Sequence, residues 1–432
     1  MNPELQRNLW LEATPFRLAL IAGLLLLVFT ATSVAPVALA TKSGMASGLY
    51  WFFAVLWGTR SAALSVVAEI RERTWDGQKL SAIGPWEMVW GKLFGATAAN
   101  WFGALLCLPV ILVPAWQDQG AVFAITYGVI LLSLGIFSQT MALLSSLVLI
   151  RRNTGNWRLD TFLCQVAGIG VGFAYYSLWS SIPAVLRSSA QSVAWWGRDF
   201  NLSTFHLASL LLFLTWALVG CWRAMRAELR SANGPYVWLA YLAYLCIYDA
   251  GFDSTISSRL GLIDMHPLQT KLALAAMALM ASTYSMAFLE PKDPVRLRWL
   301  GEQLRAGHVY KAFLASDAWM LSYGATLLAG LMLAIAYATT PLALPVLAML
   351  GFLTRDIAIF VLMRGMAGGR GDFAALAVLG ALYLLLPTIL HGAHLRELDV
   401  LFLPLRANVL GVMAAWGQGV ACAVLALRRL AR

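Results

Sequence analysis

The sequence predicts an all-α, polytopic integral membrane protein, a bundle of about twelve transmembrane helices. Hydrophobic residues make up 60% of its 432 residues and charged residues only 12%, whereas soluble domains carry about 25% charged residues. The apolar residues are also grouped into long runs, each near the roughly 20 residues that a helix needs to cross a bilayer. A soluble fold of this length would need far more polar surface, so that class is excluded.

The predicted spans follow one another along the whole chain, separated by short polar segments. The first apolar run is too long for the core of a signal peptide and has no processing site, so no cleaved signal is expected. The tenth span is unusual because Arg355 and Asp356 fall inside it. The spans lie near residues 17–40, 47–70, 93–116, 121–150, 161–186, 204–222, 236–252, 270–289, 314–338, 342–363, 373–390 and 407–427.

Lysine and arginine are concentrated in every second segment between spans. By the positive-inside rule, this asymmetry places both termini in the cytoplasm. The net charge of +10 therefore reports topology, and no nucleic-acid partner is expected. Arginine outnumbers lysine and alanine and leucine are abundant, which is typical of a GC-rich bacterium, so we expect a multi-pass protein of the bacterial cytoplasmic (inner) membrane.

The loops predict two six-helix halves, residues 1–230 and 231–432. Long charged inner loops, residues 69–92 and 290–311, follow the second and the eighth span. Similar spacing in both halves indicates a tandem repeat in one orientation. If the halves are repeats, one chain supplies both membrane halves; otherwise two copies, or a copy and a paralogue, pair.

The 69–92 loop is one of the longest charged interruptions in the sequence. Its segment EIRERTWDGQKLSAIGPWEMVWGK predicts two short helices with a break at Gly84-Pro85, because proline cannot continue a helix. Glu87 then falls in the first turn of the second helix, where an acidic residue suits the dipole. Gly91 allows the next span to pack closely.

This loop resembles the motif after the second span in membrane subunits of ABC-2 type transporters, of the kind E-R-x-x-x-T-x-[DE]-x-L…P-x-x-x-x-E-x-x-x-G-K. The Asn2-Pro3 opening also resembles the family's N-terminal interfacial helix, and the resemblance covers residues 1–226. Gln78 and Asp76-Gly77 depart from the family pattern. The residues that carry the resemblance in the loop are Glu69, Arg71, Glu72, Arg73, Thr74, Pro85, Glu87, Gly91 and Lys92.

The resemblance implies the permease subunit of an ATP-driven exporter. In that family the loop docks on a separate ATP-hydrolysing subunit and transmits its motion. This chain has no GxxxxGK[ST] phosphate loop, so ATP is expected only in a partner. We therefore expect no catalytic residues and no cofactor of its own, with ABC ATPase subunits, the lipid bilayer and a second permease chain or homodimer as the candidate partners.

Residues 1–16 form an amphipathic segment that predicts a helix in the inner membrane interface. Leu5, Leu9 and Leu11 are expected to face lipid, and Glu4, Arg7 and Glu12 to face water. At the outer face, the segments around Trp195-Trp196 and residues 401–403 are expected to be short re-entrant or interfacial helices.

Charges inside spans are costly and are usually paired or functional. Arg60, Arg355 and Asp356 lie within predicted spans, and an Arg60–Asp356 pair across the halves is one hypothesis. Contact with an anionic substrate group and a proton relay are the alternatives. His391, His394, Glu397 and Asp399 cluster in the last outer loop, but no metal site is expected there.

Two questions stay open at this point. In the 290–311 loop, Leu297, Leu300 and Leu304 form a helical stripe beside arginines, which fits either a second ATPase contact or an interfacial helix held by anionic lipid. The alternatives to the exporter are an ion- or proton-coupled secondary transporter with twelve spans and a membrane-embedded enzyme.

Overall fold

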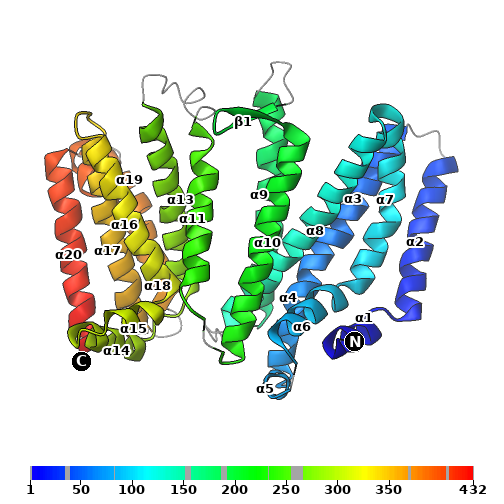
Figure 1. Cartoon of the computed structure of the whole chain (residues 1–432), viewed down its shortest axis with the longest axis horizontal. Helices are drawn as coiled ribbons and strands as arrows, with labels where there is room; N and C mark the ends of the chain where they lie inside the picture. Colours follow the sequence, from blue (N-terminus) through cyan, green and yellow to red (C-terminus); the bar gives the residue numbers. More distant parts are fainter. Residues whose placement is uncertain are drawn as a thin grey trace. The chain divides into compact units, whose positions relative to one another are not determined.

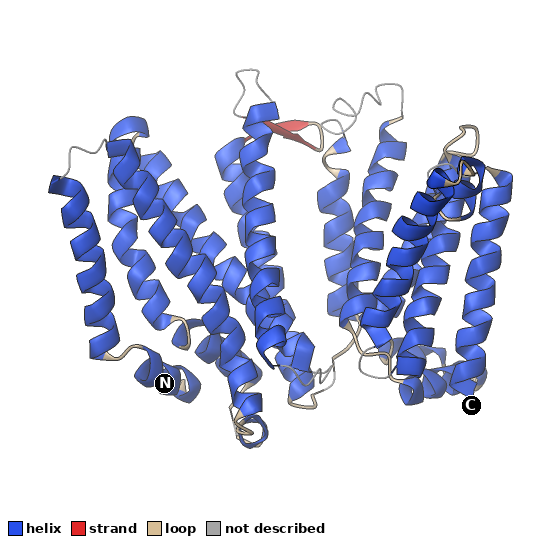
Figure 2. Cartoon of the chain, turned by 180° about the vertical axis from the view of Figure 1, so that it is seen from behind, coloured by secondary structure: helices blue, strands red, loops and turns tan. Residues whose placement is uncertain are grey.

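The computed structural model describes residues 2–34, 39–81, 83–150, 157–185, 192–231, 233–253, 266–367, 371–404 and 408–431. Within these ranges, one short hairpin, β1 (Ser192–Trp195) and β2 (Arg198–Asn201), is the only sheet, and the other elements are helices (Figure 2). The predicted all-α class is confirmed.

In the described part of the chain, ten helices or helical runs are long and apolar enough to cross a bilayer. A polytopic membrane protein is therefore confirmed. α9 (Trp157–Val185) and the shorter α11 (Tyr236–Ala250) lie where the remaining two spans are predicted, and the count of twelve stays a prediction. The ten are α2 (Pro15–Val34), the run α3, η1 and α4 (Leu39–Tyr50, Trp51–Trp57, Gly58–Arg71), α7 (Ala98–Gln119), α8 (Ala121–Ile150), α10 (Leu202–Glu228), α13 (Pro267–Leu289), α16 (Ala318–Ala336), α17 (Ala343–Ala367), the run α18, η4 and α19 (Gly371–Gly380, Ala381–Leu385, Leu386–Gly392) and α20 (Val409–Ala431).

The chain divides into two compact units. Unit 1 comprises Met1–Val193 and Phe200–Asn233, and unit 2 comprises Ala194–Asp199 and Gly234–Arg432. Each unit also contains short helices, of which α1 in unit 1 and α14 and α15 in unit 2 lie across the ends of long ones (Figure 1). The short helices are α1 (Pro3–Glu12), α5 (Trp75–Lys79), α6 (Pro85–Trp90) and η2 (Gly91–Gly95) in unit 1, and α14 (Pro294–Arg305), α15 (Val309–Leu314) and η5 (Arg396–Leu401) in unit 2.

The core of unit 1 forms where α4, α8 and α10 meet the loop helices. Met88 and Leu93 are buried there against Leu143 of α8 and Cys221 of α10. In unit 2, α17 is the central helix: Leu353 and Phe360 are buried against α13, α16 and α18. Cys107, Cys164 and Cys221 are buried and pack as small apolar residues, and the cysteines in the described part of the chain are free thiols.

A π-helical segment, η1, interrupts the second span between α3 and α4. Two glutamines on neighbouring helices donate to its carbonyls: Gln139 Nε2 to Ala54 O at 2.8 Å, and Gln165 Nε2 to Leu56 O at 3.0 Å. Gln139 is fully buried, and its Oε1 accepts from Trp101 Nε1 at 2.9 Å. Side-chain amides thus satisfy backbone groups of an irregular turn at membrane depth, where water is absent.

The segment around Trp195-Trp196 is a β-hairpin tip and not the helix that we predicted. Trp196 and Gly197 both have positive φ, 51° and 69°, and two consecutive positive φ values make the tight turn that joins antiparallel strands. The tip lies on the end of α11: Trp195 Nε1 donates to Tyr248 O at 3.0 Å and Trp196 N to Gly251 O at 2.8 Å. In the second outer segment, where a short helix was predicted at residues 401–403, the helix is the 3-10 helix η5 (Arg396–Leu401), and Phe402 and Leu403 follow its end.

Replacing Gln139 by leucine should destabilise unit 1. The substitution keeps the side chain's approximate volume but leaves Trp101 Nε1 without its acceptor, at a cost of about 1–2 kcal/mol. Equilibrium unfolding of the purified protein in mixed micelles measures the change. Gln117→Leu, at an exposed position at the end of α7, is the control, and equal stability of the two variants would contradict the assignment.

Candidate functional site

The 69–92 loop folds as predicted, into two short helices with a break between them. α5 ends at Lys79, and α6 begins at Pro85, its first helical residue. Glu87 Oε2 accepts from the Gly84 N–H at 3.1 Å, which satisfies a donor at the start of α6. At the other end, Thr74 N–H and hydroxyl donate to the Glu69 carbonyl at 2.9 and 3.2 Å. These hydrogen bonds satisfy backbone groups where the chain enters α5 and α6.

A buried ammonium group lies at the base of this loop. The Lys92 side chain is 0% exposed, and its Nζ forms an ion pair with Glu69 Oε2. Nζ also donates to Glu4 Oε1 and to Gln78 Oε1, each at 3.2 Å. A buried charge is stable only when it is paired and hydrogen-bonded. Lys92 can therefore be buried here only when these partners surround it. Six side chains joined by these and neighbouring hydrogen bonds form the Lys92 cluster: Glu4, Arg7, Asn8, Glu69, Gln78 and Lys92.

The N-terminal helix α1 supplies half of the Lys92 cluster. Asn8 Nδ2 donates to Glu4 Oε1 at 3.0 Å and to Gly91 O at 3.2 Å. Arg7 donates to Glu4 Oε1 at 3.0 Å and also bonds to Glu69. Asn2 caps α1 with its Oδ1 and donates its Nδ2 to Glu87 O at 2.7 Å. α1 is thereby bound to α6, to η2 and, through Glu69, to the end of α4.

The predicted orientation of α1 is wrong for Glu4, whereas Arg7 and Glu12 are partly exposed as predicted. Glu4 was expected to face water, but it is buried against Lys92. The buried ammonium group requires a counter-charge, and Glu4 supplies one. Trp10 and Leu11 are exposed on the same helix. These side chains suit the membrane interface, so α1 turns Glu4 and Asn8 to the protein and keeps an apolar edge outward.

Two glycines one helical turn apart allow α1 to approach so closely. A Cβ on Gly91 would lie 2.7 Å from Glu4 Cβ and 2.8 Å from Leu5 N, and one on Gly95 would lie 2.6 Å from Asn8 Cβ. Neither position has room for a side chain. Gly91 thus serves close packing as predicted, and the contacting element is α1.

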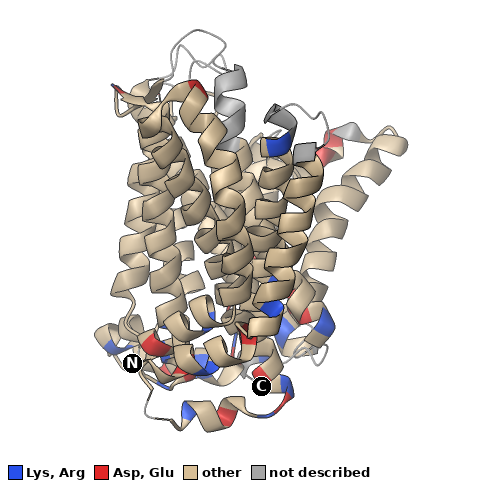
Figure 3. Cartoon of the chain, turned by 90° about the vertical axis from the view of Figure 1, so that its right-hand side faces the viewer, with Lys and Arg blue, Asp and Glu red and all other residues tan. Residues whose placement is uncertain are grey.

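The predicted coupling residues separate into two groups. Glu69, Gly91 and Lys92 are buried in or beside the Lys92 cluster, so they are not available for contact with another protein. The others lie at or near the surface, where Figure 3 shows charged residues gathered near the N-terminus. The exposed tip of the loop consists of Arg71, Glu72, Arg73, Thr74, Asp76 and Leu80.

The exposed tip combines charge with one apolar side chain. Leu80 is 88% exposed, and Arg71 stacks on the Trp157 ring with 4.3 Å between its Cζ and the ring centroid. Arg73 has a φ of 59°, a strained value for a residue with a Cβ. Trp75 is buried beneath the tip with Lys92 Nζ 5.1 Å from its ring centroid. The tip is therefore anchored by Trp75 to the buried cluster.

Replacing Lys92 by methionine should strongly destabilise the protein. The change removes the buried cation that Glu4 and Glu69 share and leaves them only the half-exposed Arg7, and breaking a buried pair typically costs about 3–5 kcal/mol. The double variant Lys92→Met with Glu69→Gln should recover part of that loss. Unfolding in mixed micelles measures both, with Lys79→Met, at a partly exposed lysine, as the control; a single variant as stable as the control would contradict this account.

A second buried charge lies at the middle of α17 in unit 2. Arg355 Nε donates to Asp356 Oδ1 at 2.9 Å, and Arg355 Nη1 to Gln418 Oε1 at 2.9 Å. Asp356 Oδ2 accepts from the hydroxyls of Tyr284 and Tyr383, each at 2.7 Å. Arg355 and Asp356 are both buried, so four helices, α13, α17, η4 of the α18 run and α20, meet at one ion pair.

The hypothesis of an Arg60–Asp356 pair joins residues of different units and stays a prediction. Arg60 is exposed at the surface of unit 1. Asp356 already accepts hydrogen bonds at both of its oxygens from residues of its own unit. Two of the groups that donate to Asp356, the hydroxyls of Tyr284 and Tyr383, were not predicted from the sequence, because these residues lie 72 and 27 positions away along the chain.

Asp356→Asn should destabilise unit 2, because Arg355 then remains buried without a counter-charge. The expected loss is about 3 kcal/mol. The double variant Arg355→Gln with Asp356→Asn removes both charges and should be more stable than Asp356→Asn alone. The order of the three melting temperatures in detergent tests this, and a double variant that is the least stable of the three would contradict the pairing.

The histidine and acidic residues near α19 form one local pair. His391 Nδ1 lies 3.4 Å from Asp399 Oδ2, and Asp399 is buried. Among the residues that the structure describes, no three His, Cys, Asp or Glu side chains come together in a way that could hold a metal ion.

The fold and the buried charges define a class: a polytopic, all-α membrane protein whose charges are concentrated at helix ends and at one point of α17. Comparisons with protein-family models, with curated proteins and with solved structures find no match for this chain. Its function therefore has to be argued from its own residues.

Proposed function

We propose that this chain is the membrane-spanning permease subunit of an ATP-driven exporter of the ABC-2 type. A separate ATPase subunit binds at the exposed tip of the 69–92 loop. The observation that supports this most directly is the construction of that loop, which exposes Glu72, Thr74 and Leu80 while its base is fixed by the buried Lys92 cluster.

A loop that transmits force needs a rigid connection to the spans. In this chain the connection runs from the exposed tip through Gln78 to Glu69 at the end of α4, and through Lys92 to η2 and α7. α1 adds a further contact through Glu4. A displacement of the tip would therefore move α4, α7 and α1 together, which is the requirement for coupling ATP binding to a change in the transmembrane helices.

The chain carries no phosphate loop in its sequence, so the ATPase of this proposal is another polypeptide. The loop's exposed charges are of both signs, with Arg71 and Arg73 beside Glu72 and Asp76. Such a mixed surface fits a protein partner with complementary charges, and a purely positive loop would instead fit the membrane surface. The proposal also places the protein in the bacterial cytoplasmic membrane with this loop on the inner side.

The second candidate is an ion- or proton-coupled secondary transporter. The observation that favours it is the Arg355–Asp356 pair, because ionisable residues at mid-membrane depth frequently mark ion pathways. However, both Asp356 oxygens and the Arg355 Nε are already hydrogen-bonded, which is the pattern of a structural centre. The exporter therefore remains the function that the residues support best.

Co-purification tests the proposed function. The tagged full chain should bring down an ATPase that contains a phosphate loop, and the double variant Glu72→Ala with Leu80→Ser should lose it. Both side chains are exposed, and neither belongs to the Lys92 cluster, so the variant's melting temperature should be unchanged. Binding is quantified by mass spectrometry of the purified complex.

The matched control is Asp118→Ala with Val122→Ser. These residues are an exposed acid and an exposed apolar side chain at the turn between α7 and α8, the opposite end of unit 1 from α5 (Figure 1). The control should keep the ATPase. Transport driven by an ion gradient in vesicles that contain only this chain would instead establish the secondary transporter.

A further inference from the structure

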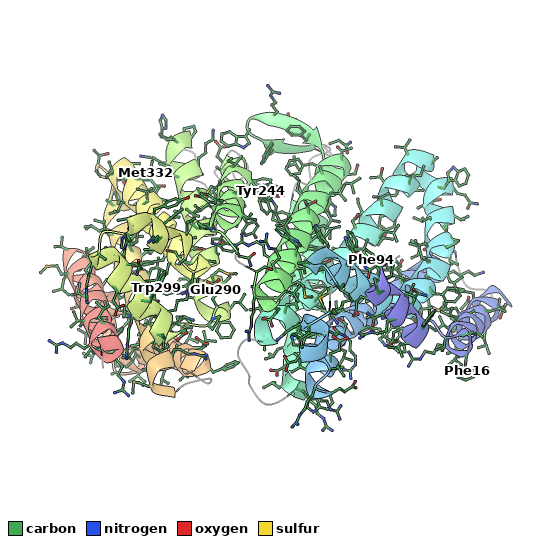
Figure 4. The ribbon with its side chains drawn as sticks, turned by 60° about the horizontal axis from the view of Figure 1, so that its bottom comes forward. Phe16, Phe94, Tyr244, Glu290, Trp299 and Met332 are labelled. Atoms are coloured by element: carbon green, nitrogen blue, oxygen red, sulfur yellow. The ribbon has the colours of Figure 1, made fainter. Side chains whose placement is uncertain are left out.

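We propose that α14 and α15 of unit 2 form a binding surface for the headgroups of anionic phospholipids. The two helices lie in the 290–311 loop and its continuation, across the ends of the unit 2 spans (Figure 1). Figure 4 marks Glu290 and Trp299, the start of this segment and a side chain of α14. This surface belongs to a different segment from the proposed ATPase contact.

The segment is held firmly against the rest of unit 2. Lys292 is buried, and its Nζ pairs with Asp372 Oδ1 at 3.0 Å. Glu290 Oε2 accepts from Trp319 N at 2.9 Å. Further along, Arg296 pairs with Asp317 at 3.0 Å, and Leu300 is buried. One side of α14 is thus committed to the protein, so the side chains that remain outside present a fixed surface.

Apolar side chains are exposed along this fixed surface. Val295 is 72% and Trp299 41% exposed, one helical turn apart on α14, and Val309 of α15 is 62% exposed. Leu304, at the end of α14, is exposed as well. Apolar groups grouped at the end of a membrane span suit the boundary between headgroups and acyl chains, and tryptophan is enriched at that depth.

Cationic side chains accompany the apolar ones. Arg298 and Arg305 lie two helical turns apart on α14, and Lys311 lies on α15; all three are exposed. The described residues offer none of the three an ion pair at 4.0 Å or less, in contrast to Lys292 and Arg296, whose charges are used within the protein. Guanidinium groups form charge-assisted, often bidentate hydrogen bonds with phosphate. A lipid phosphate is the ligand that complements both features.

The exposed side chains distinguish this surface from the tip of the 69–92 loop. That tip carries basic and acidic residues in equal measure with a single apolar side chain, Leu80. On α14 and α15, several apolar side chains occur beside an excess of basic ones, and Glu302 is the exposed acid on α14 after its cap Asp293. This composition is typical of helices that lie on an anionic bilayer, and the observations therefore favour lipid over a second ATPase contact.

Native mass spectrometry of the purified full chain tests the proposal. Dioleoylphosphatidylglycerol and dioleoylphosphatidylcholine, which have the same acyl chains, are titrated separately onto the delipidated protein. The wild type should bind the glycerol lipid more tightly. The double variant Arg298→Gln with Arg305→Gln should lose roughly fivefold in its affinity for that lipid for each charge removed, with binding of the choline lipid unchanged.

Two further variants separate this effect from folding and from total charge. Arg298→Lys with Arg305→Lys keeps the charges and should retain most of the preference. Arg73→Gln with Arg230→Gln removes two exposed arginines from unit 1 and should keep it in full. An undiminished lipid preference in Arg298→Gln with Arg305→Gln, or an equal loss of preference in the unit 1 variant, overturns the proposal. If Arg298→Gln with Arg305→Gln instead loses ATPase co-purification while its lipid binding is intact, the surface is a second ATPase contact and the proposal is also overturned.

Discussion

The pairing of the Lys92 ammonium is the interaction on which the organisation of unit 1 depends. An ammonium group without partners in an apolar interior is far too costly to persist, so the residues that pair with it must converge on it. Glu69 comes from the end of α4, Gln78 from α5 and Glu4 from α1. Each arrives from a different direction, and the paths of the three helices are fixed relative to η2 by one charge. The glycines at 91 and 95 then follow as a steric requirement, because α1 can deliver Glu4 and Asn8 only if its backbone lies directly on η2.

This arrangement divides the 69–92 loop into a base and a tip with different physical roles. The base consists of ions and amides that bond to one another and leave little for a partner. The tip exposes charge and one leucine above a buried Trp75. Side chains near each other in the sequence therefore differ in their roles: Glu69 is buried and structural, whereas Glu72, three residues later, is exposed and accessible to another protein. A motif of charged residues in a loop does not by itself reveal this division.

The sequence was sufficient for the elements whose cause is local. Apolar runs predicted the spans, and Pro85 predicted the start of α6. The errors arose where a tertiary contact decides the outcome. Glu4 looked solvent-facing because its partner, Lys92, is 88 residues away. Gln78 was noticed only as a departure from the family pattern, yet its amide can donate to Glu69 and accept from Lys92 at once, which neither an acidic nor an apolar residue could do. At Trp196-Gly197 a local signal was present, since glycine favours the positive φ of a tight turn, and the neighbouring tryptophans masked it.

The two units solve the problem of buried charge in different ways, and the difference bears on what each loop can contact. In unit 1 the buried cation, Lys92, lies at the end of the loop and pairs with Glu69 at its start. The residues between them therefore form a polar projection with an exposed tip. In unit 2 the buried Lys292 lies at the beginning of its loop and pairs with Asp372 at the start of α18. The residues that follow are therefore held close to the helix ends from the outset and lie along them as α14. A loop fixed at its start and lying flat presents a side to the bilayer, whereas a loop fixed at its base and projecting presents a tip to a soluble protein. If both proposals hold, the position of one lysine within each loop accounts for the different partners of the two units.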